Sequence, residues 1–177
     1  VVTDSWPAYV QPVGPVPQTL PGHAEVMQYT YNLEKAQEEM AQSAYAGQTD
    51  IPFTLSWCAE VPDEEKVALL FQANAAEIGI DVEIFKKPFG SMIDDAQTVE
   101  TTPNGSIVYV GAHYNEAGSI LETRYHSKSQ GTWEQCEWLG MPEMDAAIED
   151  ALATSDQDER FAKYAKNGCN YARVWMW

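Results

Sequence analysis

The chain has 177 residues, of which 45% are hydrophobic and 21% charged, a composition typical of a folded globular protein. Its 27 acidic residues outweigh 10 lysines and arginines, so the formal net charge is −17. Nucleic acids and anionic membranes both attract cationic partners, so this charge argues against nucleic-acid binding and against adsorption to a lipid surface. The sequence has no apolar run of about 18 residues and no leader-like segment after Val1, so we expect no membrane span or export signal within it.

The motifs of most enzyme and metal sites are missing from the sequence. It contains no Gly-x-Ser-x-Gly elbow and no phosphate-binding glycine loop. Its three cysteines are too few and too far apart for a disulfide framework or a CxxC metal site, and their disulfide state stays open. They are Cys58, Cys136 and Cys169. We therefore expect no cofactor and no metal, with one alternative: a surface cation site made by His113 and His126 with Glu116 or Glu122.

The N-terminal part is rich in proline, which fixes φ and removes an amide donor. Five prolines fall within residues 1–27, and we expect an extended surface segment over residues 1–28. Asn32 then caps a predicted helix whose inward positions include Leu33 and Met40.

Apolar periodicity next predicts strands alternating with helices. The expected strands are Ile51–Trp57, Ile80–Ile84 and Ile107–Val110, the last covered on both faces because it is apolar throughout. One helix should start at Pro62, bury a stripe of Val67, Leu70, Phe71, Ala75 and Ile78, and end at Gly79. A shorter helix should follow Pro88. This alternation predicts an α/β fold with a mostly parallel sheet and crossover helices.

The periodicity lapses between Gly111 and Gly140. A loop of this length is functional or packed on itself, and Trp133 and Trp138 within it either stack on a ligand or pin the loop to the body. A pair of C-terminal helices is expected after it, one opened by Pro142 and one capped by Asp156.

Four phrases, in this order, resemble a known family. The segment 29–36 (YTYNLEKA) resembles the "YDPEKAK" helix start of the oligopeptide, dipeptide and nickel-type solute-binding proteins of ABC importers. The segment 76–83 (AEIGIDVE) resembles their "LKKIGIDVEL" passage, and 107–121 resembles their ligand-facing "GWxADYxDPxxFL" loop. The segments 141–145 and 156–160 resemble "NPEFDALIDEA…TDPEERxALY".

The resemblance implies a fold and a function. Members of this family are two-lobed proteins that close around a ligand and deliver it to a membrane permease. The chain would then be a C-terminal portion of such a protein: a partial lobe of the periplasmic-binding-protein type II-like fold. We expect an α/β lobe over residues 29–166 and a divergent tail at 167–177. It would be periplasmic or extracellular, with a lipid anchor left open, monomeric, and not an enzyme.

The resemblance also points to the ligand-facing residues. They are His113, Tyr114, Asn115 and Glu116. In peptide-binding relatives an aspartate at the position of His113 pairs with the ligand's α-amino group; here either Glu116 receives the amine or the ligand has no free amino terminus.

Less specific interpretations of these residues and of the whole chain also stay open. His113 could be a hydrogen-bonded histidine at a strand end, and Glu116 a solvated carboxylate. Two other functions are alternatives: a small hydrolase using the Cys58 thiol, and an acidic α/β interaction domain without a ligand cleft.

Overall fold

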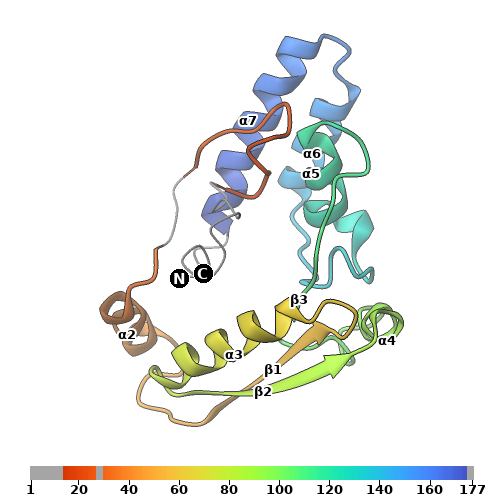
Figure 1. The fold of residues 1–177 in the computed structure, drawn as a ribbon. Coiled ribbons are helices and arrows are strands. Elements are labelled where there is room, and N and C mark those ends of the chain that lie inside the picture. The colour runs from red at the N-terminus through yellow and green to blue at the C-terminus, as the bar shows by residue number, and fades with distance from the viewer. Residues whose placement is uncertain (1–13, 27–29, 175–177) are drawn as a thin grey trace. The chain divides into compact units, whose positions relative to one another are not determined.

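The computed structural model describes residues 14–26 and 30–174, with side chains to residue 168. The chain divides into two compact units (Figure 1): one comprises residues 1–29 and 110–177, and the other residues 30–109. We call them the helical unit and the sheet unit. The domain boundaries expected from the sequence stay a prediction, because the two units are defined only by the density of contacts within the chain.

The sheet unit is a three-stranded parallel sheet with helices in its connections. Its strands are β1 (Ile51–Cys58), β2 (Ile80–Lys87) and β3 (Gly105–Ile107), in the spatial order β2-β1-β3. The first crossover contains α3 (Asp63–Ala76) and the second α4 (Phe89–Asp95), while α2 (Leu33–Gln42) precedes β1. The predicted parallel sheet with crossover helices is confirmed.

Local signals explain several of these boundaries. The Asn32 side chain accepts a hydrogen bond from the Lys35 N–H and caps α2 as predicted. Gly79, with φ of 81°, follows α3 and takes the left-handed conformation that ends many helices.

The third strand lies earlier in the chain than predicted. Asn104 Oδ1 accepts hydrogen bonds from the Thr54 N–H at 2.8 Å and the Thr54 hydroxyl at 2.9 Å, which aligns these two residues. The following residues Gly105–Ile107 therefore pair with Leu55–Trp57, and β1 ends one residue later at Cys58. Ile107 is the last residue of β3, so the prediction of a strand at Ile107–Val110 was wrong for residues 108–110.

Helix α3 packs on the sheet through small side chains. Ala68 and Ala75 are buried, and beneath the helix Leu55, Trp57 and Val82 form the core of this unit. The predicted burial of Phe71 was wrong: its ring lies 5.5 Å from that of Phe53, but 41% of the residue is exposed.

The helical unit consists of α5 (Ala117–Tyr125), the short 3-10 helix η1 (Ser127–Ser129), α6 (Pro142–Ala153) and α7 (Gln157–Val174). Helices α6 and α7 are the predicted C-terminal pair, and α7 continues into the expected tail. Leu121, Ile148 and Tyr164, one from each α-helix, are at most 1% exposed and form the centre of the core.

The prediction that residues 111–140 lack regular structure was wrong because α5 lies there. All five residues from Ala117 to Leu121 are buried. A helix covered on more than one side has no alternating polar face, so its sequence carries no amphipathic period.

Residues 14–22 of the proline-rich segment form turns and bends rather than extended chain. Val16 is 3% exposed within the helical core, and the Pro21 carbonyl accepts from the Ala117 N–H at 2.9 Å. The remaining expectation for residues 1–13 and 27–28 lies outside the described residues.

A side chain at position 118 of α5 should destabilise the helical unit. A Cβ atom there would come within 2.7 Å of Tyr164 Cζ, and Tyr164 is 1% exposed and unable to move away cheaply. We expect Gly118→Ala to lower the free energy of unfolding by about 1–3 kcal/mol through overpacking.

Urea unfolding followed by circular dichroism measures this loss. Gly90→Ala in α4 is the matched control, since a Cβ atom there meets nothing within 4 Å and should change stability by less than about 1 kcal/mol. Equal unfolding midpoints for the two variants would contradict the packing argument.

Candidate functional site

The four residues predicted to face a ligand lie in one loop of the helical unit, directly before α5. His113, Tyr114 and Asn115 are exposed, and Glu116 is half-buried. Glu116 is also the N-cap residue of α5, with extended φ and ψ of −150° and 156°. The loop is therefore fixed at its C-terminal end by the helix and presents three polar side chains to solvent.

Glu116 is bound by an arginine that is 44 positions away in the sequence. Arg160 Nε donates to Glu116 Oε2 at 3.0 Å and Nη2 donates to Oε1 at 2.8 Å, a bidentate pair. The third guanidinium nitrogen, Nη1, donates to the carbonyls of Thr154 and Ser155 between α6 and α7. The hydrogen bond from Arg160 lowers the pKa of Glu116. With both oxygens engaged, this carboxylate anchors the loop.

Tyr114 keeps its phenol proton over a wide pH range. Burial, and then the charges of Tyr164, Glu122 and Glu116, raise the pKa of Tyr114 to about 12, against the opposing effect of Arg160. The residue is still 43% exposed. It offers a neutral hydroxyl that can donate or accept a hydrogen bond.

His113 is held through both its backbone and its ring. Its N–H donates to Ser119 Oγ at 2.7 Å, and its Nε2 lies 3.0 Å from Glu134 Oε1. Its side chain is nevertheless 57% exposed. His113 is thus hydrogen-bonded, as one interpretation expected, but it lies in the loop before α5 and not at the end of β3, which ends at Ile107. The exposed part of its ring is compatible with a ligand contact.

The loop that carries Glu134 is packed on itself. Gln130 Nε2 donates to the carbonyls of Trp138 and Leu139, and the fully buried Gln135 donates to Leu139 as well. Trp138 has φ of 56°, a conformation that costs energy for a residue other than glycine. Trp133 and Trp138 are half-buried, which is compatible with either role expected for them.

The structure gives little support to the two alternatives, a cysteine hydrolase and a surface cation site. In the sheet unit, burial raises the pKa of the Cys58 thiol, which donates to Glu60 Oε2 at 3.1 Å. This is the reverse of an activated thiolate. Within the described ranges, no three His, Cys, Asp or Glu side chains could hold a metal ion. His126, proposed for a cation site, is buried and bonded to Lys128 N and Glu149 Oε1 instead.

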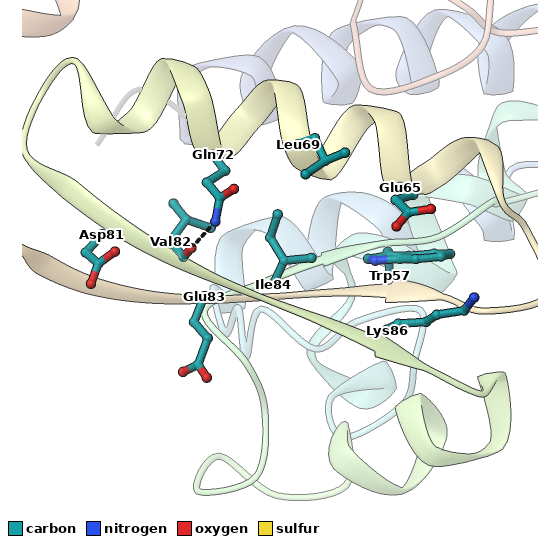
Figure 2. A pocket seen from close by; sticks show the side chains of 9 residues that line it. All are labelled: Trp57, Glu65, Leu69, Gln72, Asp81, Val82, Glu83, Ile84 and Lys86. Carbon is teal, nitrogen blue, oxygen red and sulfur yellow. Dashed lines mark hydrogen bonds between the residues drawn. The ribbon is translucent and has the colours of Figure 1, made fainter.

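The sheet unit has a separate open pocket of about 540 Å³ between α3 and β2 (Figure 2). Trp57, Leu69 and Ile84 form its apolar part, and Gln72 Nε2 donates to the Val82 carbonyl at 2.6 Å. Lys86 Nζ lies 5.1 Å from the centre of the Trp57 ring. None of the four predicted ligand-facing residues lines this pocket.

Three supporting residues were missed by sequence reasoning: Ser119, Glu134 and Arg160. Arg160 stands inside a phrase quoted for the resemblance, but nothing in the sequence pairs it with Glu116. Ser119 stands inside the segment 107–121, and Glu134 is one of many acidic residues; nothing in the sequence pairs either of them with His113.

The Arg160–Glu116 pair should make stability depend on pH. Because the pKa of Glu116 is lowered in the folded state, its contribution is present above the unfolded pKa and is lost as pH falls through the folded value. We expect Arg160→Gln to lower the melting midpoint at pH 7 and to lose this difference in acid.

Thermal unfolding of both proteins between pH 7 and pH 3 measures the effect. Arg124→Gln is the control, since this arginine of α5 forms no ion pair with any of the described residues. A destabilisation by Arg160→Gln that stays constant with pH would show that the guanidinium acts only through packing.

Comparison with known proteins identifies the family. The model described as "Bacterial extracellular solute-binding proteins, family 5 Middle" matches residues 8–132, well over half of the chain. A Brucella melitensis protein with the provisional name of a binding protein is 32% identical over 114 residues, which are 62% of this chain. The chain spans only 18% of that relative's length.

Solved structures of similar fold are also much longer than this chain. DppA, a periplasmic binding protein from Helicobacter pylori solved with the peptide STSA, has a TM-score of 0.79 at 24% identity, covering 94% of this chain and 32% of its own. NikA from Staphylococcus aureus, solved with Ni(L-His)2, has a TM-score of 0.80 at 18% identity, covering 97% and 36%.

These likenesses confirm the expected partial lobe of the periplasmic-binding-protein type II-like fold. The family match spans the loop that holds His113, Tyr114, Asn115 and Glu116. The chain belongs to the bacterial extracellular solute-binding proteins of family 5.

Proposed function

We propose that this chain is part of the substrate-binding component of an ABC importer, which captures an extracellular solute and delivers it to a membrane permease. The observation that carries the proposal is the family match over residues 8–132, since it includes the whole exposed loop before α5. A peptide or a related small molecule is the solute we favour, because DppA was solved with a peptide.

In this proposal the four loop residues have two roles, ligand contact and support of the loop. His113, Tyr114 and Asn115 contact the ligand, because their side chains are exposed on a loop whose backbone is fixed. Glu116 belongs to the same wall but supports it from behind, because Arg160 occupies both carboxylate oxygens. A ligand amine would therefore meet a residue other than Glu116.

The proposal includes no covalent chemistry. The Cys58 thiol is buried and burial raises its pKa, so a hydrolase based on it is disfavoured. We propose a monomer located outside the cytoplasmic membrane, with lipid anchoring as one way of holding it there. None of the helices within the described residues is long and apolar enough to cross a bilayer.

A ligand screen by thermal unfolding tests the proposal in the full-length protein that carries this chain. A ligand that binds only the folded state raises the melting midpoint. We expect alanine peptides of two to five residues to raise it in a concentration-dependent way, whereas a nickel–histidine complex tests the alternative cargo. No shift with any of these solutes would contradict the proposed substrate class.

Asn115→Ala measures whether the loop contacts the ligand. Its amide is exposed and can make hydrogen bonds to a peptide backbone, each worth about 0.5–1.5 kcal/mol. We expect roughly a 3- to 10-fold weaker Kd by calorimetry, with unchanged stability. Gln157→Ala, which removes an exposed amide at the start of α7, should leave Kd unchanged; equal effects would remove the loop from the site.

A further inference from the structure

One carboxyl group of the sheet unit is buried at the end of β1. Glu64, in the first turn of α3, is 4% exposed. Its Oε2 accepts a hydrogen bond from the Cys58 N–H at 2.8 Å, and its Oε1 has no hydrogen-bond partner within the described residues. The side chain therefore joins the helix to the last residue of β1 and leaves one buried oxygen without a donor.

The described part of the chain supplies no cation for Glu64. Lys66 of the same helix pairs with Asp63 at 3.0 Å, and no lysine, arginine or histidine of the described ranges forms an ion pair with Glu64. Burying a charged carboxylate in this way is far more costly than burying a neutral carboxyl group. Burial accordingly raises the pKa of Glu64, and the backbone groups of Cys58 and Tyr109 oppose it to a smaller extent.

The nearby carboxyl group of Glu60 has the opposite environment. Glu60 is exposed, and its Oε2 accepts from the Cys58 thiol at 3.1 Å and from the Phe89 N–H at 3.1 Å. The hydrogen bond from the thiol lowers the pKa of Glu60. Glu60 is thus held in its ionised form, and it ties the loop of residues 59–62 to the start of α4.

We propose that the first turn of α3 is a proton-controlled latch on the end of β1. While Glu64 is neutral, the turn stays closed on the Cys58 backbone. When Glu64 ionises, its carboxylate moves toward water and the loop of residues 59–62 is released, a local opening that leaves the rest of the fold in place. The latch goes beyond the proposed function, because it belongs to the sheet unit and needs no ligand.

Linkage gives the direction of the pH dependence. Because the pKa of Glu64 is raised in the folded state, the closed latch is most stable below the pKa of an unfolded glutamate and loses stability as pH rises through the folded value. A pKa raised by one unit corresponds to an equilibrium constant for opening that is about 10-fold larger. The latch should therefore be closed in acid and open more often as the pH increases.

The reactivity of the Cys58 thiol measures this opening in the full-length protein that carries this chain. The thiol is buried, so 4,4′-dithiodipyridine reaches it in the open state, and mass spectrometry follows the peptide that contains it. In Glu64→Gln the amide oxygen still accepts from the Cys58 N–H, but the side chain cannot ionise. We expect the ratio of the wild-type labelling rate to that of Glu64→Gln to rise about 10-fold between pH 4 and pH 8. The ratio cancels the pH dependence of the thiol itself.

Glu65→Gln is the matched control for net charge, because Glu65 is the exposed neighbour in the same helical turn. Its labelling rate should stay within about 2-fold of the wild-type rate at every pH. Infrared spectroscopy then tests the proton on Glu64 directly. At pH 5.5, where exposed carboxyl groups are largely ionised, we expect a protonated-carboxyl band that Glu64→Gln removes and Glu65→Gln keeps.

A labelling ratio that stays constant or falls with pH would overturn the latch, as would a wild type without the protonated-carboxyl band. The band can be titrated in the wild type alone, so the proposal is decided even if Glu64→Gln does not fold. None of these measurements involves a solute. Failure of the latch is therefore distinguishable from failure of the ligand screen.

Discussion

The arrangement of the helical unit depends on one bidentate ion pair, between Arg160 and Glu116. The guanidinium binds the residue that starts α5 and, with its remaining nitrogen, the carbonyls that connect α6 to α7. Three helices thus meet at one planar cation, whose fork matches a carboxylate as lysine cannot. The exposed residues 113–115 immediately precede this ion pair, which therefore restrains the position of their backbone.

The regular parts of the fold could be predicted from the sequence because their signals are local. The cap at Asn32, the glycine at Gly79 and the apolar alternation in the sequence of β1 each act within a few residues. The exact position of β3 could not be predicted, because it depends on the contact between Asn104 and Thr54. Helix α5 was missed for the opposite reason: its close burial removes the polar face by which a helix is recognised in sequence.

The candidate site shows the same division between local and distant information. Its loop was recognised from a continuous phrase, whereas Glu134 lies 21 positions from His113 and Arg160 lies 44 positions from Glu116. An acidic chain offers many carboxylates of similar sequence context, 27 in total. Only their partners in space distinguish a structural carboxylate from one that acts on a ligand.

The two carboxylates near the loop have different partners, and each holds a different part of the loop. Glu116 is neutralised by a cation of the protein, so it contributes order and almost no net field. Glu134 lies 3.0 Å from Nε2 of the His113 ring, so it positions a side chain of the loop rather than its backbone. Had the arginine bound Glu134 instead, the loop would lose its anchor at the start of α5, because one guanidinium cannot serve two separated carboxylates with bidentate geometry.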